Sequence, residues 1–490
     1  MQTERQVVFA FPPVGWQYVN MGRELYDSVD VFRQAIHECD KVAGPLLPQL
    51  PSAVLYPAVK DEVLYKEAID SATYAQPCLF AVEYALGKLV ASNGFMPTAV
   101  IGHSVGEYVA SVFAGVLDMP TALTLVCERS TQMQNSVRAM GCMLSTRATA
   151  EQCEAALATL AGKDTALRAR VALAAVNGPL STVIAGELPA VSAAVDALPA
   201  GTKTTRVRAS HADHSPVMDP ICAPLRAKAE AMFKGAPPQR PKTTMASTVT
   251  GKVVGASERL DAEHWVRHTL GTVQFSSALA SLLASLRGQG GVLCVEMGGG
   301  MLARFVSDCV ERKIGGAADE VALCTQALPR QIDDEDAAQP SLRAHLASTL
   351  QKLSDATGKG VTGFTQLTGS VATASATGDS DELLDLVALS PDALDASVRA
   401  LLEANATVAS PEREPWAKSL IDLGAIGEQA PLLDAIEAAL GGSMRPLRLD
   451  KAYITTAGTF SFQLWRTRAS LPPPPKYIQP LPRNECVGGF

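Results

Sequence analysis

The sequence predicts an α/β fold: a mainly parallel sheet covered by helices, interrupted by a small inserted subdomain and followed by a mainly helical C-terminal appendage. Short β-prone runs alternate with longer helical patterns through about residue 325, which is typical of a parallel sheet with helical crossovers. Residues 140–206 change to a βαββα order, which is typical of a ferredoxin-like subdomain. Beyond that point the composition changes again, which indicates a separate C-terminal part.

The first part of the large domain, residues 1–139, opens with the apolar run Gln6–Phe11, which predicts a buried strand. Helical stretches and one more strand-like run follow it. In chain order they are the helices Met21–Cys39 and Ala75–Ala91, the strand Thr98–Ile101 and the helix Val105–Ala114.

The small subdomain, residues 140–206, contains three β-prone runs and two helical ones. The strands are Cys142–Ser145, Val171–Val176 and Ser181–Ala185, and the helices are Ala150–Leu160 and Leu188–Leu198. A further strand would complete the βαββαβ motif before the large domain resumes in residues 207–325.

The C-terminal third divides into three predicted parts. Residues 326–385 are expected to form a linker, because Gly360–Asp381 is rich in Gly, Ser, Thr and Ala and contains no Pro. Residues 386–450 have an amphipathic pattern that predicts a helical domain. Residues 451–490 are expected to form an extended tail, in which the run Pro472–Pro475 favours polyproline II structure.

The composition excludes several classes of protein. The 490 residues are 47% hydrophobic and 19% charged, far from the composition of a disordered chain. A net charge of −8 disfavours nucleic acid and anionic membranes as partners. No apolar run reaches the roughly 18 residues that span a bilayer, and no secretory signal pattern opens the chain. The ten cysteines form no CxxC motif, so we expect reduced thiols, no metal site and a cytoplasmic location.

One short motif in the large domain indicates catalysis. Gly102, Ser104 and Gly106 form a G-x-S-x-G pattern that directly follows a strand-like run and opens a helix. The chain bends sharply at such a motif and exposes the serine hydroxyl, so small residues must flank it. The helix N-terminus offers unpaired N–H groups to an oxyanion, and the N–H of Val105 is the natural donor. Because the pattern alone arises by chance about 0.2 times in such a chain, its position between strand and helix is the informative part.

The segment Gly102–Tyr108 resembles the signature of the malonyl-CoA:acyl-carrier-protein transacylase family, which supplies the acyltransferase domains of fatty-acid and polyketide synthases. Five further segments resemble motif blocks of this family, in the same order, within residues 6–325. They are Met21–Tyr26, Gln76–Ala81, Ala174–Pro179, His211–Ser215 and Val295–Gly300. The resemblance implies an α/β-hydrolase-like large domain with a ferredoxin-like small one.

The resemblance also implies roles for individual residues. Ser104 is the nucleophile, and His214 is the general base, oriented by a backbone carbonyl rather than by an acidic side chain. Arg129 binds the free carboxylate of a malonyl group, since a guanidinium fork matches a carboxylate. The other substrate-binding residues are Gln76, His103, His211 and Asn177. The alternatives are a satisfied structural histidine for His214, a helix-surface arginine for Arg129 and a helix-capping amide for Gln76.

Two positions depart from the family pattern. Pro13–Gln17 replaces the family's Gly-Gln-Gly-Ser-Gln loop, so the second oxyanion donor falls on the N–H of Val14. One such donor contributes about 3–4 kcal/mol to catalysis. Asp213 stands where malonyl-selective members usually have Phe. Its carboxylate would repel malonyl unless it points away or pairs with a cation.

The activity implied by the resemblance is transfer of a malonyl group from malonyl-CoA, through an ester on Ser104, to the phosphopantetheine thiol of an acyl carrier protein in fatty-acid or polyketide synthesis. No tightly bound cofactor is needed. The expected partners are CoA thioesters, the carrier protein and other synthase components. An acidic carrier would dock on basic residues, for which the candidates are Arg206, Arg208, Arg226 and Lys228, although ordinary solvated charges are the alternative.

Two alternative functions stay open. One is a hydrolase on the same scaffold that clears stalled acyl groups, and the other is a catalytically silent docking module. The nature of the C-terminal third also stays open. In the C-terminal third, Leu420–Gln429 vaguely resembles the start of a carrier-protein helix, but Gly427 stands where the phosphopantetheine serine would be. Residues 386–450 are therefore either a degenerate carrier-like domain or an unrelated helical appendage.

Overall fold

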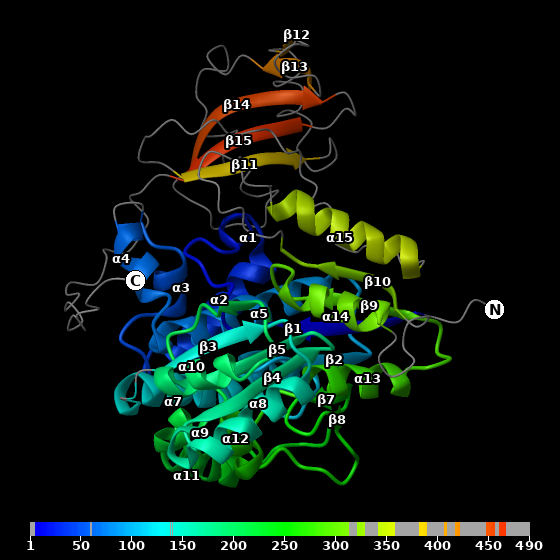
Figure 1. Cartoon of the computed structure of the whole chain (residues 1–490). Helices are drawn as coiled ribbons and strands as arrows, with labels where there is room; N and C mark the ends of the chain where they lie inside the picture. The colour runs from blue at the N-terminus through cyan, green and yellow to red at the C-terminus, as the bar shows by residue number, and fades with distance from the viewer. Residues whose placement is uncertain are drawn as a thin grey trace. The chain divides into compact units, whose positions relative to one another are not determined.

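The computed structural model describes residues 5–58, 61–137, 139, 141–312, 321–328 and 342–357, together with five C-terminal strands (Figure 1). The chain divides into two compact units, Met1–Thr368 and Gly369–Phe490. Within these described residues, no helix is both long and apolar enough to cross a lipid bilayer.

A six-stranded sheet forms the centre of the first unit, with the strand order β10-β9-β1-β2-β7-β8. Its strands are β1 (Gln6–Phe11), β2 (Ala99–Gly102), β7 (Thr244–Ser247), β8 (Lys252–Val253), β9 (Val292–Glu296) and β10 (Val321–Gln326). All neighbouring pairs are parallel except β7 and β8. Strand β1 lies between β9 and β2 and is almost entirely buried, as its apolar run predicts. The predicted parallel sheet is confirmed.

Helices cover both faces of this sheet, and two separate hydrophobic clusters fill the space beneath them. They are α1 (Arg23–Ser28), α2 (Asp30–Ala43), α3 (Pro51–Leu55), α4 (Glu62–Ala68), α5 (Ala72–Ser92), α6 (Val105–Phe113), α7 (Met119–Ser136), α11 (Asp219–Gly235), α12 (Ala262–Leu270), α13 (Phe275–Ser285) and α14 (Met301–Glu311). The single helix predicted over Met21–Cys39 is two helices, because Val29 adopts an extended conformation, with φ −121° and ψ 107°, between α1 and α2.

The small subdomain contains a four-stranded antiparallel sheet with the order β4-β5-β3-β6. Its elements are β3 (Gly141–Thr146), α8 (Ala150–Lys163), α9 (Thr165–Arg168), β4 (Val171–Gly178), β5 (Ser181–Glu187), α10 (Leu188–Asp196) and β6 (Thr204–Arg206). A hydrophobic cluster of its own, including Leu157, Ile184 and Val191, holds the helices on one face of the sheet. This is the predicted ferredoxin-like arrangement, and β6 supplies the last strand of the motif.

The predicted linker, residues 326–385, contains a helix. Helix α15 (Leu342–Thr357) buries Leu346, Leu350 and Leu353 against the first hydrophobic cluster, at the spacing of one helix face. The backbone N–H of Leu342 donates to Glu24 Oε2 at 2.6 Å. The linker prediction is therefore wrong for this stretch, because its leucines have an apolar surface of the first unit to cover. The flexible segment predicted at Gly360–Asp381 lies outside the described residues.

The second unit contains a five-stranded antiparallel sheet with the order β11-β15-β14-β13-β12. Its strands are β11 (Glu382–Leu389), β12 (Ala406–Val408), β13 (Ala417–Ile421), β14 (Leu447–Thr455) and β15 (Phe460–Arg466). The described part of residues 386–450 is thus strand, and the prediction of a mainly helical appendage is wrong there. Apolar and polar residues alternate in β15, Phe-Ser-Phe-Gln-Leu, which is the period of a strand.

The reason for this error is that the pairing is mostly long-range. Strand β11 pairs with β15, so that Glu382 lies opposite Arg466, and local periodicity does not reveal such a partner. Leu420 and Ile421, where the carrier-like helix is expected to begin, belong to β13. The rest of that motif and Pro472–Pro475 of the predicted tail lie outside the described residues.

Candidate active site

Ser104 sits at a sharp turn between β2 and α6. Its backbone has φ 50° and ψ −124°, a strained conformation for a residue with a side chain. A Cβ atom at Gly102 would clash with the backbone of Gly106, and one at Gly106 would clash with the carbonyl oxygen of Phe11. The two flanking glycines are therefore required by the close packing of the turn against β1, as in a strand–turn–helix nucleophile elbow.

The structure brings His214 to this serine from 110 positions away in the sequence. Ser104 Oγ lies 2.7 Å from His214 Nε2, and His214 Nδ1 lies 3.1 Å from the carbonyl oxygen of Gly271. Because a carbonyl oxygen only accepts hydrogen bonds, the neutral imidazole carries its proton on Nδ1. The lone pair of Nε2 then faces the serine hydroxyl, which is the arrangement of a general base.

The imidazole of His214 is held in its neutral form. Burial lowers its pKa well below 6.5, and the positive charge of Arg129 and the neighbouring His268 and His103 lower it further. Ser104 and His214 are only 3% and 2% exposed. At neutral pH the base is therefore unprotonated and ready to accept the serine proton.

The two predicted oxyanion donors lie at the same edge of the sheet. Val105 is the first residue of α6, so its N–H has no partner within the helix. Strand β1 ends at Phe11, which lies opposite Gly102 at the end of β2, and the Pro13–Gln17 loop follows directly. Within that loop the N–H of Gly15 donates to Gln17 Oε1 at 2.7 Å, and Val14 lines a small cavity with Gln76 and Asp213.

Arg129 is fully buried in α7 and reaches two polar side chains. Its Nη1 donates to Gln76 Oε1, and its Nη2 lies 3.7 Å from Asp213 Oδ2. Arg129 Nε and Nη2 and Asp213 Oδ1 make no hydrogen bond to any described residue. Burial raises the pKa of Asp213, whereas Arg129 and then His211 oppose that rise. The departure noted at Asp213 is thus a buried carboxylate beside the arginine expected to bind the substrate's carboxylate.

The remaining predicted substrate-binding residues fall into two places. His103 Nε2 lies 2.7 Å from Asn177 Oδ1, and this contact joins the nucleophile turn to β4 of the small subdomain. Burial lowers the pKa of His103 to about 4, so its ring is neutral. His211 is partly buried, with Nδ1 3.0 Å from Ser210 Oγ, and lies on the loop that carries Asp213 and His214.

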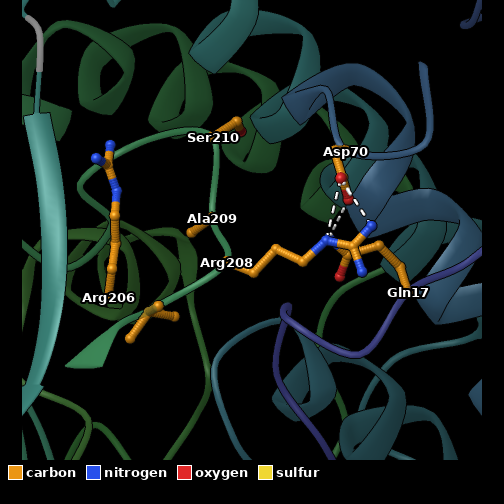
Figure 2. A pocket seen from close by; sticks show the side chains of 7 residues that line it. Gln17, Asp70, Arg206, Arg208, Ala209 and Ser210 are labelled. Atoms are coloured by element: carbon orange, nitrogen blue, oxygen red, sulfur yellow. Dashed lines mark hydrogen bonds and ion pairs between the residues drawn. The ribbon is translucent and has the colours of Figure 1, made fainter. Parts of the chain in front are cut away.

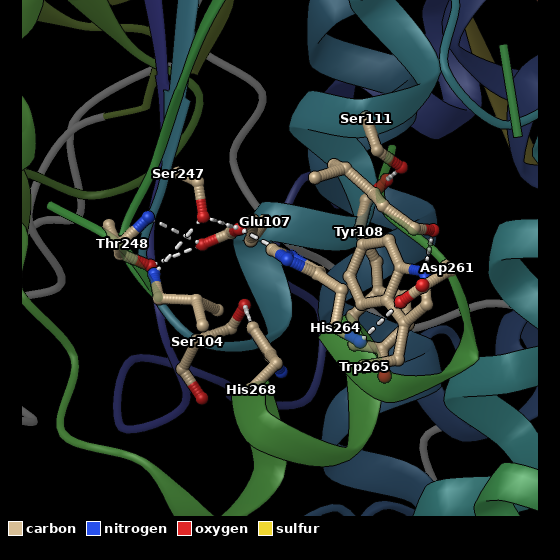
Figure 3. Close-up of polar contacts among 12 residues, drawn as sticks. Ser104, Glu107, Tyr108, Ser111, Ser247, Thr248, Asp261, His264, Trp265 and His268 are labelled. Carbon is tan, nitrogen blue, oxygen red and sulfur yellow. Dashed lines mark hydrogen bonds and ion pairs between the residues drawn. The ribbon is translucent and has the colours of Figure 1, made fainter. Parts of the chain in front are cut away.

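A buried polar network lies behind the nucleophile, and sequence reasoning did not identify it (Figure 3). Glu107 accepts from Ser247 Oγ at 2.8 Å, from the N–H of Thr248 at 2.9 Å and from its hydroxyl. His264 Nε2 lies 3.2 Å from Glu107 Oε1. Burial alone would raise the pKa of Glu107, but the hydrogen bond from His264 and the nearby His268 outweigh it and lower the pKa to about 2.

The same network reaches the nucleophile through His268, whose Nε2 donates to the carbonyl oxygen of Ser104 at 3.0 Å. Burial lowers the pKa of His268 to about 4. A signal for these residues was present in the sequence. Glu107 follows the nucleophile by three positions, and His264 and His268 are four apart, on one face of α12.

An open pocket of about 380 Å³ leads to the surface and is lined by Gln17, Asp70 and residues 206–210. Figure 2 shows the side chain of Arg208 reaching Asp70, with 2.8 Å between Arg208 Nη2 and Asp70 Oδ2. Gln17, Asp70, Ala209 and Ser210 also line the smaller cavity beside Gln76 and Asp213, so the two spaces adjoin.

Two of the four basic residues expected to dock a carrier are already paired with carboxylates. Arg208 pairs with Asp70, and Arg226 pairs with Glu263 at 2.7 Å. Among the described residues, no group of three or more His, Cys, Asp or Glu side chains is placed to hold a metal ion.

Matches to known proteins agree with the serine–histidine site described above. Residues 8–292 match the family model described as the acyl transferase domain. The chain is 35% identical over 318 residues to the polyketide synthase GfsA of Streptomyces halstedii, a match that covers 64% of this chain and 4% of that protein. The chain therefore corresponds to a small fraction of the curated relatives it matches.

Solved structures agree. A loading acyltransferase from the avermectin modular polyketide synthase is 30% identical, with a TM-score of 0.58 over 71% of this chain and 99% of that one. The acyl transferase domain of SpnD, solved in a complex with 2-(pent-4-yn-1-yl)malonyl, is 29% identical, with a TM-score of 0.60 over 72% and 77%. With the serine elbow, its histidine and the two-part α/β fold already in place, these matches show that the chain belongs to the acyl transferase domain family.

Proposed function

We propose that this chain transfers an acyl group from a CoA thioester to the phosphopantetheine thiol of an acyl carrier protein, with malonyl-CoA as a donor and an ester on Ser104 as the intermediate. The observation that carries this proposal is the 2.7 Å contact between Ser104 Oγ and His214 Nε2. A buried, neutral imidazole beside a hydroxyl at a helix N-terminus is an activated nucleophile.

In the first half-reaction His214 Nε2 takes the hydroxyl proton while Ser104 Oγ attacks the thioester carbonyl carbon. The negative charge that forms on the carbonyl oxygen is stabilised by the N–H of Val105, with the N–H of Val14 as the proposed second donor. The C–S bond then breaks, and the CoA sulfur leaves with the proton that His214 held. The product is an acyl ester on Ser104.

In the second half-reaction the carrier's thiol replaces CoA. Its proton passes to His214 Nε2, its sulfur attacks the ester carbon, and Ser104 Oγ leaves and takes the proton back. The open pocket lined by Gln17, Asp70 and Arg206 is the proposed entry for both thiol arms, since it adjoins the cavity beside Gln76. The nearly complete burial of the Ser104–His214 pair supports transfer over hydrolysis, because water is kept from the ester.

Intact-mass measurement tests this proposal. The full chain, incubated with malonyl-CoA, should gain one malonyl group, and Ser104→Ala should gain none. Ser307→Ala, an exposed serine on α14, serves as the matched control and should load like the wild type. Added holo-carrier protein should then remove the malonyl group faster than buffer does. Absence of loading would favour a silent docking module, and equal loss to buffer and to carrier would favour a hydrolase.

A further inference from the structure

We infer that Asp213 is a specificity-determining residue that compensates the charge of Arg129, so that the acyl pocket accepts uncharged acyl groups such as acetyl as well as malonyl. This inference rests on the proposed function, since it concerns which acyl group Ser104 receives.

The first step is geometric. Asp213 Oδ2 lies 3.7 Å from Arg129 Nη2, and the two residues are 3% and 0% exposed. Asp213 and Gln76 both line the small cavity, and Gln76 accepts from Arg129 Nη1. The protein has therefore placed its own carboxylate at the group that would otherwise bind the carboxylate of the substrate.

The second step concerns hydrogen bonds. At 3.7 Å, Asp213 Oδ2 is too far from Arg129 Nη2 for a hydrogen bond. Arg129 Nη2, Arg129 Nε and Asp213 Oδ1 make no hydrogen bond with any described residue. Buried polar atoms are nearly always paired in native structures, and orphaned ones call for an explanation. A ligand acceptor would satisfy the two Arg129 donors, whereas Asp213 Oδ1 needs a donor such as a water molecule.

The third step concerns charge. Burial raises the pKa of Asp213, and the charge of Arg129 opposes that rise. Burial lowers the pKa of His211, so the ionised form of Asp213 would cancel the charge of Arg129 around this part of the cavity. A malonyl carboxylate would be attracted by Arg129 and repelled by Asp213 at a similar distance. Two unit charges about 4 Å apart at an effective dielectric constant of about 20 change binding by about 1,000-fold. The repulsion thus offsets much of the selectivity that an unopposed arginine would give.

The test is a competition between equimolar malonyl-CoA and acetyl-CoA, read as the ratio of the two acyl-enzymes by intact mass. We expect the wild type to load both groups with rates within about tenfold of each other. Asp213→Asn, which keeps the size and removes the charge, should raise the malonyl-to-acetyl ratio by about 100-fold to 1,000-fold. Because both acyl groups compete for the same enzyme molecules, the ratio does not depend on how much of the variant is folded.

Asp40→Asn is the matched control. Asp40, on α2, is also a buried carboxylate, but it lines neither cavity. Its Oδ1 accepts a hydrogen bond from the N–H of Ser52 at 3.0 Å. The malonyl-to-acetyl ratio of Asp40→Asn should equal that of the wild type. A wild-type preference for malonyl above about 100-fold, or an unchanged ratio in Asp213→Asn, would overturn the inference while leaving acyl transfer intact. If no acyl group is gained by the wild type from either donor, the proposed function itself fails.

Discussion

Replacing Glu107 by Gln should destabilise the acyl transferase domain, because four hydrogen-bond donors converge on this one carboxylate. They come from Ser247 Oγ, from the N–H and hydroxyl of Thr248 and from His264 Nε2. Glutamine has the same size, but its amide nitrogen would face donors instead of accepting from them. Both Thr248 donors reach Oε2, whereas Ser247 Oγ and His264 Nε2 reach Oε1, so the amide keeps its oxygen toward Thr248 only by turning its nitrogen toward the other two groups. His264 Nε2 then loses its acceptor, and the negative charge that all four donors stabilise is gone.

The size of the effect follows from the carboxyl pKa. The pKa of Glu107 is lowered from its ordinary value of 4.5 to about 2, despite burial that would raise it, because of His264, His268 and Thr248. At about 1.4 kcal/mol for each tenfold change in proton affinity, the ionised carboxylate stabilises the folded state by about 3 kcal/mol at pH 7. Since the folded-state pKa is the lower one, this stabilisation is complete above pH 4.5 and is lost as the pH falls toward 2.

Urea unfolding followed by tryptophan fluorescence would measure the loss of stability in Glu107→Gln. Trp265 is buried and stacks on Tyr108, with ring centroids 4.1 Å apart, next to His264 in the network. Glu107→Gln should unfold about 3 kcal/mol more easily than the wild type at pH 7, and this difference should shrink below pH 4.5. Glu154→Gln, an exposed glutamate on α8, should have no effect. A difference below about 1 kcal/mol at pH 7 would refute the reasoning.

Three further outcomes are expected. Acyl-enzyme formation, measured by rapid quench, should keep its rate as the pH falls through 6.5, because burial and Arg129 lower the pKa of His214 well below that value; a half-maximal rate near pH 6.5 would contradict this. Gly106→Ala should abolish soluble, active protein, since its Cβ would clash with the Phe11 carbonyl, whereas Gly162→Ala has open space and should be tolerated. Arg129→Ala should shift acyl loading from malonyl toward acetyl and, by leaving Asp213 unpaired, lower stability by about 3–5 kcal/mol in thermal or urea unfolding; an unchanged malonyl-to-acetyl ratio would remove its assigned role.

Much of the first unit could be predicted from the sequence, because local hydrophobic patterns are enough to identify most of its strands and helices. Gln6–Phe11 is β1 with the predicted bounds, and the helices predicted from Ala150 and Leu188 begin at those residues. The break at Val29 was missed because the apolar pattern continues across it. The helix α15 and the C-terminal sheet were missed because they depend on distant surfaces and strands.

The candidate site was predictable only in part, for the same reason. Ser104 could be found because the chemistry of a tight turn requires glycines at fixed spacing, and that requirement is local. His214, by contrast, is indicated only by the resemblance to the family, because the residues around it do not by themselves point to a general base. The Glu107 network was overlooked because a glutamate and two histidines on helices look like ordinary surface residues until their burial is known.

The sequence by itself determined the alternation of strands and helices, the strained serine turn and the presence of an arginine and a carboxylate among the residues of the site. Only the tertiary structure decided that Ser104 Oγ and His214 Nε2 lie 2.7 Å apart and that Asp213 is buried beside Arg129. The physical reason is that turn geometry and periodicity act over a few residues, whereas proton transfer and charge compensation depend on distances between side chains that only the packed core brings together.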